Sequence, residues 1–188
     1  MNTNAIEQLV VEISKDPFNP LTNFNCAVEY EALNQTASAV SFYLRAAEYG
    51  VDTHPIIVYT SLLRMAHCFA DQNDRINTVS NCVLQAAAYL PERPEAYFLM
   101  SQFYERQAAW QECYTWAEMG LAVPPVDPLP ADVGYQDSYV LLFEKAVSAW
   151  WIGRKDESKR IFEELSKKSL TPEYTSSVQS NLNRIWQE

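Results

Sequence analysis

The chain has 188 residues, enough for one domain with a substantial core, and its 48% hydrophobic and 20% charged residues argue against disorder. Lys and Arg number 14 against 24 Asp and Glu, and this net charge of −10 disfavours binding to nucleic-acid phosphates. Only four glycines occur, which excludes a glycine-rich phosphate loop, and no apolar run approaches the roughly 20 residues of a membrane helix. We therefore expect a soluble, cytoplasmic, mostly helical protein that has no signal peptide and binds neither nucleic acid nor membrane.

The ten prolines divide the chain into stretches long enough for pairs of helices, since proline disrupts a helix interior. Residues 1–16 have the spacing of an amphipathic helix, and residues 171–187 begin a second one at Pro172. We expect one domain over 1–188. Between the two terminal helices we expect a first helical pair at 20–51, a second at 56–91, a third at 94–125, a proline-rich connector at 122–137 and a fourth pair at 138–168.

Small residues recur at a fixed interval within these pairs. Three pairs place one small residue 12 positions before another: Ala27 and Ala39, Ser101 and Cys113, Ala146 and Ser158. In the second pair the gap from Ala66 to Val79 is 13, which predicts one extra residue in the turn at 71–74. Small side chains let two helix backbones approach closely, and one hairpin cannot bury its own apolar face, so the hairpins must stack on one another.

This order of large, small and aromatic residues resembles the tetratricopeptide repeat over residues 20–168, although Lys145 stands where that repeat usually has leucine. The resemblance implies an all-α, right-handed superhelix (a solenoid) of about four helical hairpins with N- and C-terminal capping helices. It also implies protein or peptide binding in a concave groove lined by the first helix of each hairpin.

Residues 91–185 also resemble the helical module attached to some family-2 glycosyltransferases, in the order of their segments and in the long connector. Those enzymes carry a separate α/β domain with an Asp-x-Asp motif, and this chain has neither feature. The resemblance therefore implies a binding or scaffolding module and no catalytic activity.

Catalytic and metal-binding patterns are weak. The four cysteines form no C-x-x-C pair and lie among small or apolar neighbours, so we expect structural thiols rather than disulfides. His67 and Cys68 are adjacent, and adjacent helical residues point in different directions, which disfavours a nucleophilic pair. We expect no enzyme activity and no cofactor or metal.

Mapping the groove onto the four first helices gives a set of candidate partner-binding residues. An aromatic residue or leucine in each repeat is expected to form an apolar strip, at Phe24, Leu63, Phe98 and Phe143. Beside it we expect a mainly acidic line with some apolar members, formed by Val28, Glu31, His67, Asp71, Gln102, Glu105, Arg106, Val147 and Trp150. The alternative is that these aromatic side chains pack in the core, or that a terminal helix of the chain fills the groove.

The leading interpretation is a non-catalytic scaffold that binds a protein or peptide segment. Two alternatives remain open: an accessory module of a glycosyltransferase system, and a structural component of a larger assembly such as a viral particle. The acidic residues 1–140 and the nearly neutral residues 141–188 also allow head-to-tail self-association. Functional use of the connector at 122–137 is a further open point.

Overall fold

The computed structural model describes residues 3–70 and 75–185, and every regular element in these ranges is a helix. This confirms the all-α class. By their internal contacts the residues divide into two compact units: unit 1 holds residues 1–91 and 127–133, and unit 2 holds residues 92–126 and 134–188. The single domain expected over 1–188 stays a prediction.

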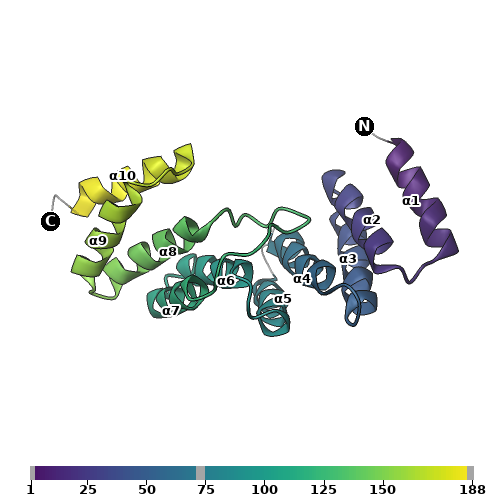
Figure 1. Ribbon diagram of the computed structural model, residues 1–188, viewed down its shortest axis with the longest axis horizontal. Coiled ribbons are helices and arrows are strands. Elements are labelled where there is room, and N and C mark those ends of the chain that lie inside the picture. The colour runs from purple at the N-terminus through teal and green to yellow at the C-terminus, as the bar shows by residue number, and fades with distance from the viewer. Residues whose placement is uncertain (1–2, 71–74, 186–188) are drawn as a thin grey trace. The chain divides into compact units, whose positions relative to one another are not determined.

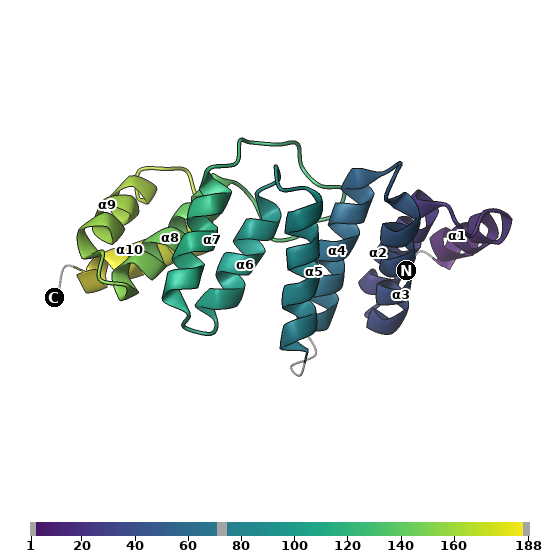
Figure 2. The ribbon, with the colours of Figure 1, turned by 90° about the horizontal axis from the view of Figure 1, so that it is seen from below.

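Unit 1 contains an N-terminal helix followed by two antiparallel hairpins. Its helices are α1 (Thr3–Lys15), α2 (Pro20–Ala32), α3 (Thr36–Gly50), α4 (Pro55–Ala70) and α5 (Ile76–Tyr89) (Figure 1). Within the hairpins α2 packs on α3 and α4 on α5, while α3 also packs on α4 and α2 contacts α4 (Figure 2). The first helices of the two hairpins therefore meet on one face of the unit.

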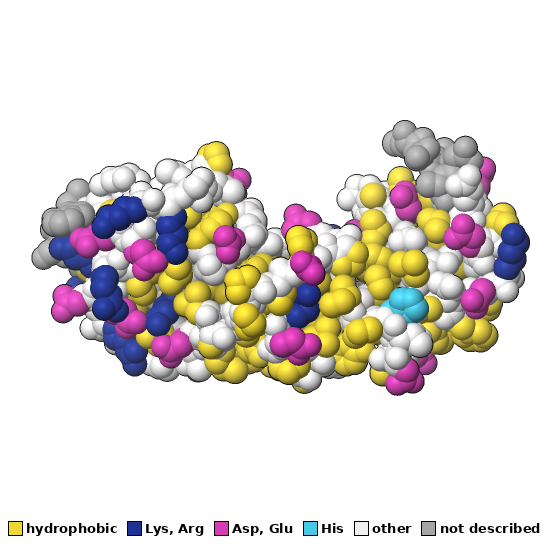
Figure 3. Space-filling model, viewed as in Figure 1, with side chains coloured by type: hydrophobic (Ala, Val, Ile, Leu, Met, Phe, Trp, Pro, Cys, Tyr) yellow, Lys and Arg dark blue, Asp and Glu magenta, His cyan; other side chains and the backbone are white. Residues whose placement is uncertain are grey.

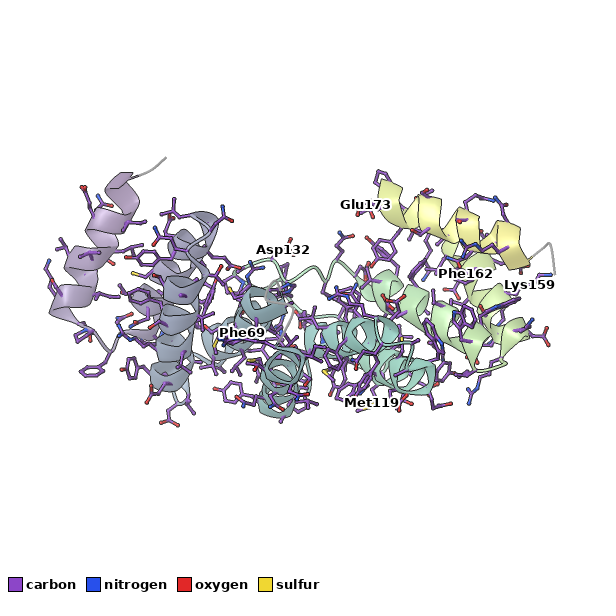
Figure 4. The ribbon with its side chains drawn as sticks, turned by 180° about the vertical axis from the view of Figure 1, so that it is seen from behind. Phe69, Met119, Asp132, Lys159, Phe162 and Glu173 are labelled. Atoms are coloured by element: carbon purple, nitrogen blue, oxygen red, sulfur yellow. The ribbon has the colours of Figure 1, made fainter. Side chains whose placement is uncertain are left out.

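Unit 2 repeats this arrangement and closes with the C-terminal helix. Its helices are α6 (Glu95–Glu105), α7 (Trp110–Leu121), α8 (Ser138–Trp151), α9 (Lys155–Leu165) and α10 (Pro172–Ile185). The neighbours are again α6 with α7, α7 with α8, α8 with α9, and α6 with α8. Val178 and Leu182 of α10 are buried in the same core as Phe162 of α9, which Figure 4 labels.

The small residues predicted to lie at the helix crossings are fully buried. Ala27, Ala39, Ser101, Cys113, Ala146 and Ser158 all have 0% exposure. The Ser158 hydroxyl donates to the carbonyl of Ala146 at 2.7 Å, which joins α9 to α8 across the 12-residue interval. In the second hairpin Ala66 is buried and Val79 only half-buried, and the turn at 71–74 lies outside the described residues.

Three hairpins share one backbone device at the turn. Asn34, Ala108 and Gly153 adopt positive φ angles of 58°, 54° and 85°, and each stands five positions before the small residue of the second helix. The amide after each of them donates to the carbonyl five positions back, at 2.9, 3.0 and 2.8 Å respectively. This is the pattern of a Schellman motif, which satisfies the last carbonyls of the first helix.

Side-chain charge is uneven along the chain. Basic side chains gather over α9 and α10 of unit 2, where Figure 3 shows them in dark blue among acidic neighbours. Among these basic and acidic side chains, Lys168 and Glu164 form an ion pair, with Nζ 3.0 Å from Oε1.

None of the helices in the described part of the chain combines the length and apolar character that a membrane crossing requires.

The turn device generates a paired prediction. Ala108→Gly removes the cost of a left-handed conformation for an L-residue, and we expect a net gain of about 1 kcal/mol in the free energy of unfolding. Gly153→Ala should lose a similar amount. Thermal unfolding followed by circular dichroism should show shifts of about 2–4 °C in opposite directions.

Ala122→Gly is the matched control, because Ala122 caps α7 with an ordinary helical φ of −80°. Glycine there relieves no strain and should leave stability unchanged or lower it. A Tm for Ala108→Gly at or below that of Ala122→Gly would contradict the assigned role of the turn.

Candidate functional site

Three of the four residues expected to form an apolar binding strip lie in the core instead. Phe24, Leu63 and Phe98 are 2%, 0% and 1% exposed. The reason is helical geometry, because each stands three positions before a small residue of the helix crossing and so shares its face. Phe143 has the same spacing and is half-buried, with its ring 5.8 Å from that of Phe162 and 5.2 Å from that of Tyr174 in α10. The helix α10 thus packs against the apolar residue expected to be open.

We call the face on which the first helices contact each other the first-helix face; it is formed by α2 and α4 in unit 1 and by α6 and α8 in unit 2. The residues directly after the buried small residues are all half-buried: Val28, His67, Gln102 and Val147. Glu31, Glu105 and Trp150 are also half-buried, and Arg106 is exposed. Asp71 lies outside the described residues.

In unit 1 the first-helix face centres on an ion pair between α2 and α4. Glu31 accepts hydrogen bonds from the Nε of Arg64 at 3.1 Å, from its Nη2, and from the hydroxyl of Tyr43 at 2.7 Å. The Cys68 thiol lies 3.6 Å from the same carboxylate. The carboxylate therefore fixes the guanidinium in a forked geometry, which is the strong and directional form of such a pair.

Burial and the ion pair of Glu31 with Arg64 shift the pKa values of the titratable groups on this face. Burial by itself would raise the pKa of Glu31, but hydrogen bonds from Arg64 and Tyr43 outweigh it and hold the pKa below its usual value. Burial, followed by the charge of Arg64, lowers the pKa of His67 below its ordinary 6.5. At neutral pH this face thus presents an ionised pair beside an uncharged imidazole.

A segment of the connector lies on the same face. We call residues 127–133 the strap; they belong to unit 1, and Figure 4 labels Asp132 beside α4. Nη1 of Arg64 donates to the main-chain carbonyl of Asp132, and Nε2 of His67 lies 3.2 Å from that of Val133. The side chain of Val133 is 3% exposed. The face expected to bind a peptide therefore already holds an extended piece of this chain.

Arg64 is the residue that the sequence analysis missed. It stands three positions before His67, so the two share one helix face, and that spacing was the signal that could have found it. Its partner Glu31 was among the candidates, but a pairing across 33 residues leaves no local pattern.

In unit 2 the first-helix face contains a buried carboxyl group on α8. Glu144 is 5% exposed and lies among Gln102 and Glu105 of α6 and Arg106, which follows that helix. The Sγ atom of Cys113 in α7 is 4.0 Å from its Oε2. Burial, and then the charge of Glu105, raise the pKa of Glu144 to about 8, against the opposing effects of Gln102 and Arg106. Glu144 is therefore largely protonated at neutral pH.

Lys145, the departure from the repeat pattern, joins three helices of unit 2. Its Nζ lies 3.2 Å from Glu118 in α7 and 3.3 Å from Glu157 in α9. It also lies 5.1 Å from the ring centre of Tyr114, and the guanidinium of Arg154 lies 4.5 Å from the same ring. Cation–π and ionic contacts thus replace the apolar contact that leucine would supply.

The thiols lie inside the two units. All four cysteines are buried and none forms a disulfide. Burial raises the pKa of Cys26 to about 11 and that of Cys113 to about 12, which leaves few thiolates at neutral pH. Within residues 3–70 and 75–185, no three His, Cys, Asp or Glu side chains come together as a metal site would need.

The buried Glu144 predicts a pH dependence of stability. The folded protein keeps this proton up to about pH 8, whereas an unfolded chain releases it near 4.5, so the free energy of unfolding falls as pH rises through that window. Glu144→Gln removes this component, and its Tm relative to wild type should increase steadily from pH 5 to pH 8.5.

The exposed Glu173→Gln is the control and should follow wild type across the whole range. The comparison requires differential scanning fluorimetry of both variants at matched ionic strength. A constant difference between wild type and Glu144→Gln would show that Glu144 does not titrate in this window.

No protein-family model matches the sequence, and a search of curated proteins also gives no match. Solved structures do match. The structure titled "YrrB: a TPR protein with an unusual peptide-binding site" superposes with a TM-score of 0.70 at 11% identity, covering 97% of this chain and 84% of that one. BtubC from P. vanneervenii gives 0.71 at 12% identity, covering 98% and 80% of the two chains.

A third structure is that of TTC0263, described as a thermophilic TPR protein in Thermus thermophilus. It gives a TM-score of 0.57 at 11% identity and covers 97% of this chain and 89% of that chain. Identities this low show the fold alone. The likeness of residues 91–185 to a glycosyltransferase module is not among these findings and stays a prediction. From its helical order and these neighbours, we conclude that the chain has the fold of the tetratricopeptide-repeat proteins.

Proposed function

We propose that this protein is a non-catalytic scaffold that binds a protein or peptide segment on its first-helix faces. The observation that carries the proposal is the strap, because it is an extended segment held on α4 by side-chain donors. A surface that orders its own loop in this manner has the chemistry to order another segment. The fold supports the same role, and one structural neighbour is described as having a peptide-binding site.

Unit 2 offers a second contact surface of the same kind. Gln102, Glu105 and Val147 are half-buried there and Arg106 is exposed at the end of α6. A reversible protein interface has about the same share of apolar area as the rest of the surface, so mixed polarity here is compatible with such a contact. We therefore expect partner binding to depend on charge at Arg106.

Affinity capture followed by quantitative mass spectrometry tests this function. The full-length protein serves as bait in an extract of its own source, with wild type, Arg106→Glu and Arg160→Glu compared. Arg160 is the matched control, because it is an exposed arginine on α9, away from the first-helix face. We expect Arg106→Glu to lower the yield of specific partners about fivefold or more and Arg160→Glu to leave it unchanged.

Two outcomes would contradict the proposal at different levels. Capture of no protein above an unrelated acidic bait would remove the scaffold function. Equal capture by wild type and both variants would leave a scaffold but remove the first-helix face of unit 2 as its contact surface. Phe98→Ala is unsuitable as a probe, since truncating this buried ring would disturb the core.

A further inference from the structure

The main chain of the strap contacts α4. The contacts from Arg64 and His67 end on the carbonyl oxygens of Asp132 and Val133, which are adjacent in sequence. The three prolines at 125, 128 and 130 favour an extended conformation of this segment. Residues 127–133 contain no helical turn.

The two donors are held ready for such a segment. Arg64 and His67 stand one helical turn apart on α4, and the fork to Glu31 fixes the guanidinium. A carbonyl oxygen only accepts hydrogen bonds, so Nε2 of His67 carries the proton toward Val133. The lowered pKa of His67 agrees with a neutral imidazole at this position. This pre-organisation reduces the entropy lost when a segment binds.

One side chain of the strap is buried, in addition to the contacts that its main chain makes. Val133 is 3% exposed, whereas the side chains of Asp127 and Asp132 are exposed and those of Leu129 and Ala131 are only half-buried. The face therefore selects an extended backbone followed by a small branched apolar residue. Arg64 is paired with Glu31 on the same face.

We propose that the first-helix face of unit 1 is a reading site for extended segments that offer two successive carbonyls and a small branched apolar side chain. The strap fills this site in cis, and a partner segment of the same chemistry binds there by displacing it. This inference rests on the proposed scaffold function and adds both the class of partner and an autoinhibitory contact.

The cost of displacing the strap follows from its tether. A tethered segment has an effective concentration on the order of 1 mM. For an intrinsic Kd on the order of 100 µM, the occupied site binds a competing segment about tenfold more weakly than the open site. Segments that bind the open site only weakly and non-specifically therefore do not displace the strap.

Fluorescence anisotropy with a labelled peptide tests the inference. The probe has the sequence of residues 124–136, and it is titrated with the full-length protein in three forms: wild type, Val133→Asp, and a variant whose residues 127–133 are replaced by seven Gly and Ser residues. We expect both altered proteins to bind the probe about tenfold more tightly than wild type. The replacement keeps the test valid if a buried aspartate disturbs folding, and circular dichroism verifies the fold of each protein.

The donors are tested in the Gly/Ser background with the chain's two histidines as a matched pair. His67→Ala should weaken probe binding several-fold, whereas His54→Ala, an exposed residue before α4, should not change it. A probe peptide carrying Val133→Asp should not bind.

Each contrary result points to a different failure. Equal affinity of wild type and strap-replaced protein would overturn occupation in cis while leaving the scaffold function intact. Absence of binding to every form would overturn the reading site, and the capture experiment at Arg106 would then decide the scaffold function independently. A wild-type dimer that forms with rising concentration and is lost on strap replacement would show exchange of straps between copies and would also overturn occupation in cis.

Discussion

The close crossing of two helices over small side chains is the constraint on which the rest of the structure depends. At Ala27 with Ala39, and at the equivalent pairs, exposure falls to zero because no side chain beyond the first carbon or two fits between the backbones. Each crossing fixes the register of its hairpin, and that register decides which residues face inward. Three of the residues three positions earlier, Phe24, Leu63 and Phe98, are buried, and those one position later are half-buried. In the three hairpins that have the 12-residue interval, this one spacing thereby decides which residues of the first helix pack inward.

This constraint also explains how much could be predicted from the sequence. The helices, their order and the crossings followed from small residues and prolines, because these act locally and leave a periodic pattern. The burial of Phe24 and Phe98 was open to prediction by the same rule, since a residue three positions from a crossing must share its face. These rings form no open strip, because Phe24 and Phe98 share the helix face of the crossing residues and are buried. The sequence around Ala108 does not by itself indicate a positive φ angle. Only the alignment of Ala108 with Gly153, at the equivalent turn, indicates it.

The contacts of the strap could not have been predicted, for a physical reason. Hydrogen bonds from Arg64 and His67 end on main-chain carbonyls, which every residue carries, so no motif in residues 127–133 records them. The pairing of Glu31 with Arg64 and the burial of Glu144 likewise depend on residues far apart in the chain. The sequence pattern therefore predicts the helices and crossings of each unit, whereas the partners of the polar residues depend on the tertiary structure. Unit 1 places an ionised pair on its face and unit 2 a protonated carboxyl group, so equivalent faces differ in chemistry.

The strap has a consequence for the order of events during synthesis. Unit 1 is complete in its helices once residue 91 has been made, but the segment that covers its face ends at residue 133. At translation rates of roughly 5–20 residues per second, the 42 intervening residues take about 2–8 s. A nascent chain therefore presents an uncovered face for seconds before its own loop arrives. In the proposed mechanism, a partner segment made at the same time and place meets the site without competition, whereas one that arrives later competes with the tethered loop.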